Sequence, residues 1–395
     1  GDIESIPFLE TARQMIQEMG RNNVISVHLT LIPEVAGAEL KTKPTQHSVK
    51  AMQELGIQPN VLVCRSPIML DDETRRKIAL FTNVENEAVI VSYDLSTTVY
   101  ELPLVLHKQK LDEIVLGKMG VEVRHANLSA WHTMMDKFRA RKGTARIGIV
   151  GKYMELHDAY KSVYEAIFHA GLDCGVETEL VKLDSARLEA PADLDSILGS
   201  GGSSQVDGIL VPGGFGDRGI DGMVRAAEWA RTRKVPFFGI CLGMQVMAIE
   251  WARNVLGWTD ADSTEFSHAT MHPVISLLED QVDVRMMGGT MRLGRSESRI
   301  TKDTFLHKAY GATSIHERHR HRYEFSNKYR EEMLQSGLVI SAVTPDGALV
   351  ESVEWPDHPW GAGVQFHPEF TSKPTAANPL FTAFVRAIIG NTAKY

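Results

Sequence analysis

The segment GICLGMQ, residues 239–245, most restricts how this chain can fold, because it places one cysteine between two glycines at a strand-to-helix junction. The apolar run VPFF precedes it, and the helix-like VMAIEWARNV follows it. A strand that enters a helix through G-x-C-x-G is the pattern of a nucleophile elbow, a strained turn that lifts its central side chain out of the sheet. We therefore expect the sulfur of Cys241 to point into solvent above the strand ends, where the helix dipole favours a thiolate.

The alternative is a core cysteine packed beside two glycines, since free cysteine is among the most buried residue types. Two other segments favour a reactive thiol. GILVPGGFGDRG (208–219) is a strand ending in glycines whose N–H groups, with that of Leu242, can stabilise an oxyanion. GVQFHPEF (363–370) leads to His367 and Glu369, and residues two apart in an extended segment point the same way. The carboxylate can then orient an imidazole that serves as base for Cys241.

A metal site is the competing interpretation of His367 and Glu369, but no further ligands follow at a suitable spacing, and no metal ligand is predicted. The segment RHRHR, residues 318–322, invites the same interpretation because alternating histidines share one face of a strand.

The composition places the chain among soluble globular proteins. Its 395 residues exceed what one hydrophobic core usually serves, which predicts two domains. The longest apolar runs fall short of the roughly 18–20 residues of a membrane span. A net charge of −8 argues against nucleic-acid binding. The three cysteines match neither a disulfide framework nor a CxxC metal site, which predicts a reducing, cytoplasmic setting.

Strand-like and helix-like segments alternate twice along the chain. In the first part the helix-like run 6–19 is followed by strand-like runs at 23–32, 60–65 and 88–95. The second alternation begins with RIGIVGKY at 146–153. This pattern predicts two tandem α/β domains with parallel strands. We expect them at residues 1–122 and 146–395, joined by a linker at 123–145.

Taken together, PGGFG, GICLGMQ and FHPEF resemble the three signature motifs of the class I glutamine amidotransferases, over roughly residues 146–390. The resemblance implies a flavodoxin-like α/β domain in which a cysteine attacks the side-chain amide of glutamine, ammonia leaves, and water hydrolyses the glutamyl thioester. It makes Cys241 the nucleophile, His367 the general acid and base, and Glu369 the orienting carboxylate.

Five further segments are similar to the CTP synthase family: GDIES at the start, KTKPTQHSV (41–49), STEF (263–266), GGTMRLG (288–294) and ERHRHRYE (317–324). The resemblance implies that residues 1–122 are the C-terminal part of a P-loop-like parallel α/β synthetase domain. In that family UTP is phosphorylated on O4 by ATP with Mg²⁺, and ammonia from the glutaminase displaces the phosphate to give CTP, the last step of de novo CTP synthesis.

The resemblance also implies binding residues. Glu265 takes the ammonium group of glutamine, Arg322 its carboxylate, and Gly214 belongs to the oxyanion hole. The remaining glutamine contacts are Leu242, Gly243, Met244 and Gln245. The UTP and CTP contacts are Asp2, Ile3, Glu4, Lys41, Thr42, Lys43, Pro44, Thr45, Gln46 and Lys77, and the ATP contacts are Tyr93, Asp94 and Leu95. Paired lysine ammonium groups beside threonine and glutamine suit a triphosphate and a pyrimidine.

Regulation and assembly follow from the same resemblance: GTP as allosteric activator, CTP as feedback inhibitor, a homotetramer, and filaments in some organisms. The family's phosphate loop and its magnesium ligands precede the GDIES segment, and this chain has no G-x-x-x-x-G-K-[ST] run. We therefore expect the chain to lack the N-terminal ATP-loop portion that holds Mg²⁺. Two alternatives remain: a glutaminase or glutamyl hydrolase of the same fold acting alone, and a nucleotide-sensing assembly module.

Overall fold

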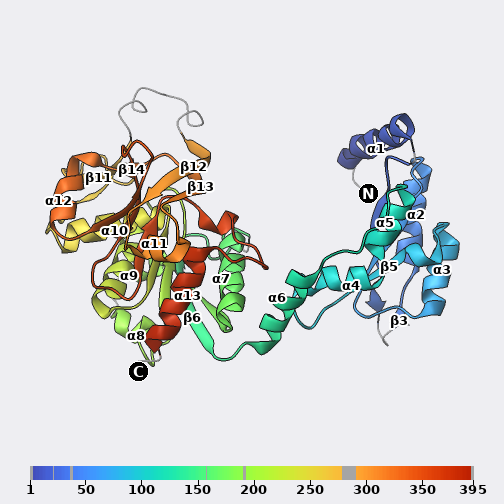
Figure 1. Cartoon of the computed structure of the whole chain (residues 1–395), viewed down its shortest axis with the longest axis horizontal. Coiled ribbons are helices and arrows are strands. Elements are labelled where there is room, and N and C mark those ends of the chain that lie inside the picture. Colours follow the sequence, from blue (N-terminus) through green and yellow to red (C-terminus); the bar gives the residue numbers. More distant parts are fainter. Residues whose placement is uncertain are drawn as a thin grey trace. The chain divides into compact units, whose positions relative to one another are not determined.

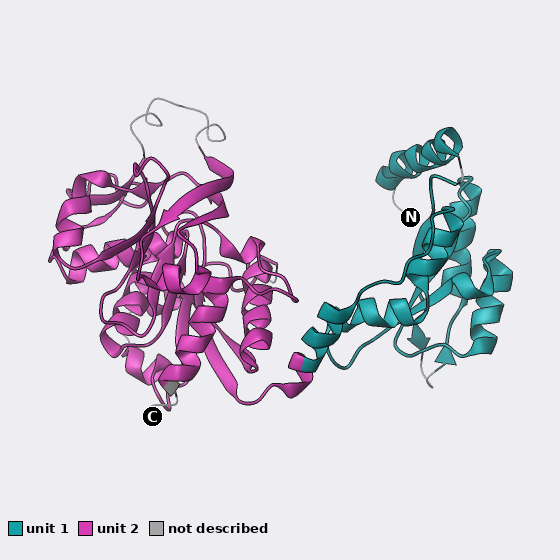
Figure 2. Ribbon diagram, viewed as in Figure 1, with its two compact units in different colours: residues 1–136 teal, residues 137–395 magenta. Residues whose placement is uncertain are grey.

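The computed structural model describes residues 3–20, 22–35, 39–156, 158–189, 193–277 and 291–392. The chain divides into two compact units, residues 1–136 and 137–395 (Figure 2). Each unit has a hydrophobic core of its own. The division falls inside helix α6 (Ser129–Ala140), which lies within the stretch 123–145 expected to be a linker.

The first unit is built on a three-stranded sheet of parallel strands in the order β1-β4-β5 (Figure 1). Its strands are β1 (Val27–Leu31), β2 (Glu34–Val35), β3 (Glu39–Leu40), β4 (Val61–Ser66) and β5 (Val89–Tyr93). Its helices are η1 (Ile3–Ser5), α1 (Ile6–Met19), α2 (Lys43–Glu54), α3 (Asp72–Thr82), η2 (Asn86–Ala88), η3 (Val99–Glu101), α4 (Leu102–Lys108), α5 (Leu111–Lys118) and α6.

The sequence predicted these elements well except at the start of β1. The helix expected at 6–19 is α1, and the strands expected at 60–65 and 88–95 are β4 and β5. The strand expected at 23–32 is shorter, because the chain first turns: the N–H of Asn23 donates to the carbonyl oxygen of Gly20 at 3.0 Å. The apolar pattern alone did not reveal this turn.

The second unit is built on a nine-stranded sheet. Its strands are β6 (Thr144–Gly151), β7 (Glu177–Asp184), β8 (Gly208–Val211), β9 (Phe237–Ile240), β10 (Asp262–Ser263), β11 (Pro273–Ser276), β12 (Arg292–Ile300), β13 (Ser314–His321), β14 (Glu324–Phe325), β15 (Val339–Val343), β16 (Val350–Glu354) and β17 (Gly361–Val364). Its helices are α7 (Lys161–Cys174), η4 (Ser185–Leu188), α8 (Leu194–Leu198), α9 (Ile220–Arg233), α10 (Leu242–Asn254), α11 (Phe305–Tyr310), η6 (Asn327–Tyr329), α12 (Arg330–Gln335), η7 (Pro368–Phe370) and α13 (Pro379–Thr392).

The large sheet has the order β13-β12-β15-β16-β17-β9-β8-β6-β7, and β10, β11 and β14 form a small sheet beside it. Strands β7, β6, β8, β9 and β17 are parallel, and β16, β15, β12 and β13 extend the sheet in antiparallel fashion. The parallel part has the 2-1-3-4-5 order of flavodoxin-like folds. The expected α/β class with two domains is confirmed.

Helices cover both faces of this sheet (Figure 1). Along β8, Ile209 and Val211 belong to the core that includes α9 and α10, whereas Leu210 belongs to the core that includes α7 and α13. A strand buried on both faces must be apolar at every position, which explains continuous runs such as GILV. In the described part of the chain, every helix is too short or too polar to cross a membrane.

The two glycines of the G-x-C-x-G turn are required by close backbone contacts. A Cβ atom on Gly243 would lie 2.2 Å from the carbonyl oxygen of Val211, and one on Gly239 would lie 2.5 Å from the carbonyl group of Gly243. Neither backbone can move without separating β8, β9 and α10. Small residues at these two positions therefore let the helix start directly above the strands.

We expect Gly243→Ala to lower the free energy of unfolding by at least about 2 kcal/mol, because the added methyl group collides with buried backbone. Chemical denaturation followed by fluorescence measures this. The matched control is Gly390→Ala in α13, where a Cβ meets nothing within 4 Å; it should instead stabilise by roughly 0.5 kcal/mol. Equal effects of the two substitutions would contradict the close-contact account.

Candidate active site

Cys241 occupies a strained turn between β9 and α10. Its backbone has φ 52° and ψ −100°, a conformation that non-glycine residues rarely adopt. The turn is held from both sides: the N–H of Cys241 donates to the carbonyl oxygen of Val364 at 2.7 Å, and its carbonyl oxygen accepts from the N–H of Met244 at 3.1 Å. This geometry is that of the elbow predicted from the sequence.

The expectation that the sulfur points into solvent is wrong. Cys241 is only 4% exposed, because a glycine loop and the segment after β17 surround it. It opens instead into a cavity of 290 Å³. The cavity is lined by Tyr153, Ala159, Tyr160, Ser162, Val163, Pro212, Gly213, Gly214, Phe215, Cys241, Arg320, His367, Glu369 and Phe370. The Cys241 thiol is thus shielded but reachable by a small molecule.

His367 and Glu369 form a buried pair in the cavity wall. Nδ1 of His367 lies 2.7 Å from Oε1 of Glu369. The extended geometry expected here is wrong, because Pro368 starts the short helix η7 and Glu369 reaches the imidazole across that turn. Burial alone lowers the pKa of His367, but the neighbouring Cys241 sulfur and the Glu369 carboxylate more than offset this and raise it to about 10. An imidazole with so high a pKa carries a proton at neutral pH and can donate it to a group in the cavity.

The second ring nitrogen of His367, Nε2, is not bound by Glu369. Nε2 of His367 is buried and makes no well-aligned hydrogen bond to the described residues. A Cβ atom on Gly213 would lie 2.9 Å from Cε1 of His367 and 3.5 Å from Cβ of Cys241, so the glycine loop lies directly against the pair. A thiol, an imidazole and a glycine loop therefore meet at one cavity, an arrangement that suits attack on a carbonyl carbon.

Lys152, at the end of β6, fixes the glycine loop and was missed in the sequence. Its buried ammonium group donates to the carbonyl oxygens of Phe215, at 3.3 Å, and Gly216. Burial lowers the pKa of Lys152 to about 8, against the opposing charge of Glu265. The sequence signal for Lys152 was its position directly after the buried strand RIGIVG, because functional residues often follow the carboxyl ends of parallel strands.

The predicted glutamine residues divide into two groups. Glu265 accepts from the N–H of Gly216 at 2.8 Å, and its carboxylate lies within electrostatic reach of Lys152 and Arg322. Burial raises the pKa of Glu265, and these neighbours oppose the rise. A Cβ on Gly214 would lie 3.2 Å from the side chain of Leu242, so these two also meet.

The other three predicted glutamine residues lie behind the turn, and of all the predicted glutamine residues only Gly214 is in the cavity wall. Gly243 packs on Val211, Met244 is fully buried, and the Gln245 amide donates to the carbonyl oxygen of Tyr323 at 3.1 Å. They support the elbow from beneath.

In the first unit, the predicted UTP and CTP residues 41–46 lie between the end of β3 and the first turn of α2. Lys41 pairs with Glu39 at 2.7 Å, and the pKa of Glu39 is lowered first by this hydrogen bond and further by the charge of Lys77. The Thr45 hydroxyl lies 2.6 Å from that of Thr30. Thr42 accepts from Gln46, while Lys43 and Pro44 are exposed in the first turn of α2.

The remaining nucleotide residues are more scattered. Tyr93 ends β5, and Asp94 pairs with Arg65 of the neighbouring strand β4 at 3.0 Å. Leu95 follows in the loop. Ile3 and Glu4 are exposed in η1, and Asp2 lies outside the described residues.

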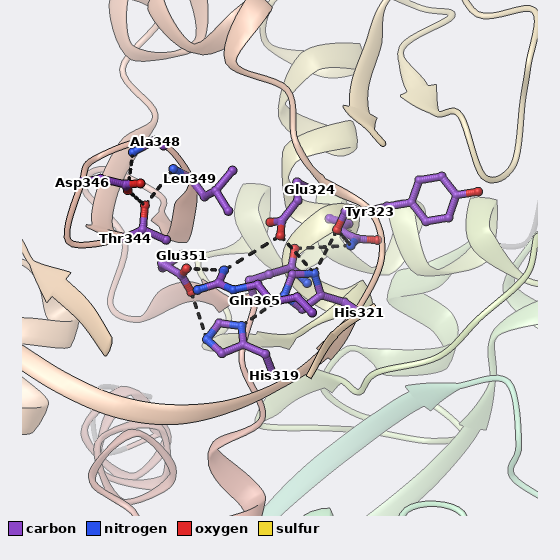
Figure 3. Close-up of polar contacts among 12 residues, drawn as sticks. His319, His321, Tyr323, Glu324, Thr344, Asp346, Ala348, Leu349, Glu351 and Gln365 are labelled. Carbon is purple, nitrogen blue, oxygen red and sulfur yellow. Dashed lines mark hydrogen bonds and ion pairs between the residues drawn. The ribbon is translucent and has the colours of Figure 1, made fainter. Parts of the chain in front are cut away.

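In RHRHR the two buried histidines contact each other, with Nδ1 of His319 lying 3.1 Å from Nε2 of His321 (Figure 3). His319 and His321 do share the buried face of β13. Within the described ranges, however, no group of three histidine, cysteine, aspartate or glutamate side chains is arranged to hold a metal ion.

The chain is similar to known proteins over its whole length. It is 50% identical to the CTP synthase of Geobacter sulfurreducens over 397 residues, which span 100% of this chain and 73% of that protein. It is 48% identical to the CTP synthase of Geobacillus kaustophilus over 390 residues, 98% of this chain and 72% of that protein. These matches cover nearly the whole of this chain and about three quarters of the length of each relative.

A cysteine on a strained turn with an imidazole beside it suits attack on an amide. Residues 155–387 match the family "Glutamine amidotransferase class-I". The glutaminase domain of Trypanosoma brucei CTPS with bound acivicin superimposes with a TM-score of 0.58 and 41% identity, covering 62% of this chain and 94% of that chain. The second unit is a class I glutamine amidotransferase domain.

Residues 1–121 match the family "CTP synthase N-terminus". Together with the relatives above, this match shows that the chain belongs to the CTP synthase family, and it is an enzyme of glutamine-dependent CTP synthesis.

Brief treatment with iodoacetamide near pH 7 should alkylate Cys241 at least about a hundredfold faster than the other cysteines. Burial raises the pKa of Cys64 to about 12 and that of Cys174 to about 11, so both stay protonated. Mass-spectrometric peptide mapping measures the rates. His367→Ala should slow labelling of Cys241 towards the other two, and equal labelling of all three cysteines in the parent chain would refute the thiolate.

Lys152→Met should lower kcat of glutamine hydrolysis about tenfold and change KM by less than about threefold, because the glycine loop loses its charged donor while the amino-acid contacts remain. Steady-state glutamate release measures both constants. The matched control is Lys182→Met, an exposed lysine on the adjacent strand β7. A KM effect without a kcat effect would contradict this role.

Proposed function

We propose that the second unit hydrolyses glutamine through a glutamyl thioester on Cys241. The observation that carries the proposal is the strained cysteine beside the 2.7 Å pair of His367 and Glu369. The sulfur attacks the side-chain amide carbon, and protonated His367 gives its proton to the leaving ammonia. The neutral imidazole then takes a proton from the water that hydrolyses the thioester.

The oxyanion formed at each step is stabilised by backbone N–H groups. The N–H of Leu242 directly follows the nucleophile, and Gly214 belongs to the loop that lies against it. Backbone donors of this kind, held in place before the reaction, are what an oxyanion hole requires. Lys152 keeps the loop in place through the carbonyl groups of Phe215 and Gly216.

The proposed substrate contacts follow the charges of an amino acid. Glu265 binds the ammonium group of glutamine and Arg322 its carboxylate, which places the side-chain amide over the cavity of Cys241. Two observations support these contacts. The side chains of Glu265 and Arg322 lie close enough to interact electrostatically, and Glu265 accepts a hydrogen bond from the N–H of Gly216 in the glycine loop. Two opposite charges at a fixed separation suit an amino acid.

The first unit is proposed to bind the nucleotides. UTP, and CTP as feedback inhibitor, bind along 41–46 with Lys77 and the segment 2–4, and ATP binds at 93–95. Support comes from the parallel order β1-β4-β5, because ligands of such sheets bind at the carboxyl ends of the strands. Both the segment after β1 and the segment after β5 lie at that edge.

Finer features of the family belong to the same proposal. They are Mg²⁺ bound with ATP, allosteric activation by GTP, a homotetramer and a cytoplasmic location. We assign Mg²⁺ to the phosphates of ATP, because phosphate oxygens and water are the ligands that this ion usually takes in nucleotide sites.

Cys241→Ala should abolish CTP formation from glutamine and leave CTP formation from ammonium salts within about twofold of the parent, because only the first route needs the thioester. The assay measures glutamate and CTP release with UTP, ATP and Mg²⁺, with and without GTP.

Cys174→Ala is the control for this experiment, since it removes a half-buried thiol away from the cavity lining. Loss of ammonia-dependent synthesis in Cys241→Ala would show that the proposed division of labour between the units is wrong. Glutamate release from Cys241→Ala at the parental rate would remove Cys241 from the mechanism.

A further inference from the structure

Tyr160 places a buried hydroxyl group at the carboxyl end of β6. The residue directly precedes α7, is 4% exposed, and lines the cavity into which Cys241 opens. Burial raises the pKa of Tyr160 to about 12, against two backbone hydrogen bonds that lower it. The hydroxyl group therefore stays neutral at physiological pH and acts through hydrogen bonds rather than through its charge.

The hydroxyl oxygen of Tyr160 accepts hydrogen bonds from two successive backbone N–H groups. The N–H of Lys152 donates to it at 3.0 Å, and that of Tyr153 at 3.3 Å. The pairing of β6 with β7 ends at Gly151 and Asp184, so both N–H groups lie just beyond the sheet. Because a buried N–H group without a partner is costly, this one phenol oxygen completes the hydrogen bonding of the strand end.

Gly151 leaves the space that the phenol fills. A Cβ atom on Gly151 would lie 2.8 Å from the hydroxyl oxygen of Tyr160 and 2.9 Å from Cε2 of the same ring. It would also lie 2.5 Å from Cε of Met154. Any side chain at this position would therefore push the phenol away from the two N–H groups.

The two residues whose N–H groups bind Tyr160 hold the glycine loop with their side chains. The Lys152 ammonium group donates to the carbonyl oxygens of Phe215, at 3.3 Å, and Gly216. The hydroxyl group of Tyr153 donates to the same carbonyl oxygen of Phe215 at 3.4 Å. Both donors act on one short segment, and the positions of both depend on the backbone that Tyr160 holds.

This segment belongs to the loop that lies against the thiol. A Cβ atom on Gly213 would lie 3.5 Å from Cβ of Cys241, and the N–H of Gly216 donates to Glu265 at 2.8 Å. In a trans peptide the carbonyl group and the N–H group point in opposite directions. The peptide that joins Phe215 to Gly216 is therefore fixed at its carbonyl oxygen by the two side-chain donors and at its N–H by Glu265.

We propose that Tyr160 is a positioning residue for glutamine hydrolysis, because its hydroxyl oxygen fixes the backbone of Lys152 and Tyr153, whose side chains hold the glycine loop. This inference rests on the proposed function, in which backbone N–H groups of that loop and of Leu242 stabilise the oxyanion. Donors that are held in place before the reaction lower its barrier, whereas a loop free to shift loses this advantage.

The test substitution is Tyr160→Phe, which keeps the ring and removes only the oxygen. It should lower kcat of glutamine hydrolysis about fivefold and change KM by less than about twofold, because the loop loses support while the amino-acid contacts remain. Steady-state glutamate release measures both constants. The matched control is Tyr164→Phe, one turn further along α7, where a half-buried hydroxyl group has no hydrogen bond to the described residues. Both of its constants should stay within about twofold of the parent.

A mutant cycle tests whether Tyr160 acts through the two side-chain donors. The background is the double variant Lys152→Met with Tyr153→Phe, in which neither donor to the loop is present. There, Tyr160→Phe should change kcat by less than about twofold, because no donor remains for it to position. A second fivefold loss in this background would show that Tyr160 acts by another route and would overturn the proposal.

Amide hydrogen exchange tests the two backbone contacts without reference to activity. The amides of residues 152 and 153 should exchange at least about tenfold faster in Tyr160→Phe than in the parent, and at the parental rate in Tyr164→Phe. Exchange mass spectrometry of peptides that cover residues 150–156 measures this. Unchanged exchange in Tyr160→Phe would overturn the role of the hydroxyl oxygen.

A second variant displaces the same hydroxyl group while Tyr160 stays in place. Gly151→Ala should lower kcat at least as far as Tyr160→Phe does, again with little change in KM. Iodoacetamide labelling of Cys174, in α7, reports on folding, because burial raises the pKa of this thiol to about 11 and keeps labelling slow. Fast labelling of Cys174 in both variants would show that Tyr160 supports the whole unit, and would overturn the specific role.

The outcomes separate this inference from the proposed function. An unchanged kcat in Tyr160→Phe, or an effect confined to KM, overturns the positioning role. Labelling of Cys241 should stay fast in the parent and in Tyr160→Phe, because alkylation of a thiol forms no oxyanion. Slow labelling of Cys241 in the parent would count against the proposed function instead.

Discussion

The second unit depends on one close backbone contact, between Gly243 and the carbonyl oxygen of Val211. It brings the first turn of α10 down onto β8 and β9, and the short connection that results forces Cys241 to a positive φ. Such strain costs on the order of 1–3 kcal/mol and persists only where the surroundings fix it. Here the hydrophobic cores on both faces of the sheet supply that constraint.

The segment that carries His367 and Glu369 is held by a second set of buried polar contacts. Glu317 accepts hydrogen bonds from the hydroxyl of Tyr310 at 2.7 Å, from the amide of Asn378 at 3.0 Å and from the hydroxyl of Thr371 at 3.0 Å. Burial raises the pKa of Glu317, and the nearby Glu369 adds to the rise. The pair of His367 and Glu369 therefore rests on a buried polar layer that the motif FHPEF does not reveal.

Much of the fold and the centre of the site could be predicted from the sequence, because both depend on local patterns. Continuous apolar runs marked β8 and β9, and G-x-C-x-G marked the elbow. The exposure of Cys241 was predicted wrongly, since the covering segments are distant in sequence. Lys152 was missed because its partners, Phe215 and Gly216, come from another loop. Pairing across strands, as between His319 and Glu351, leaves no periodic signal.

One backbone hydrogen bond joins strand β13 to the segment that carries His367 and Glu369. The N–H of His367 donates to the carbonyl oxygen of Arg318 at 2.8 Å, so the strand that leads to Arg322 is joined directly to His367. In the proposed binding mode, in which Arg322 holds the α-carboxylate of glutamine, the span from that guanidinium to the thiol is a fixed length. On this proposal, the fixed span selects amino acids by the length of their side chain. Asparagine is shorter by one methylene, so it can place its carboxylate at Arg322 or its amide at the thiol, but not both at once.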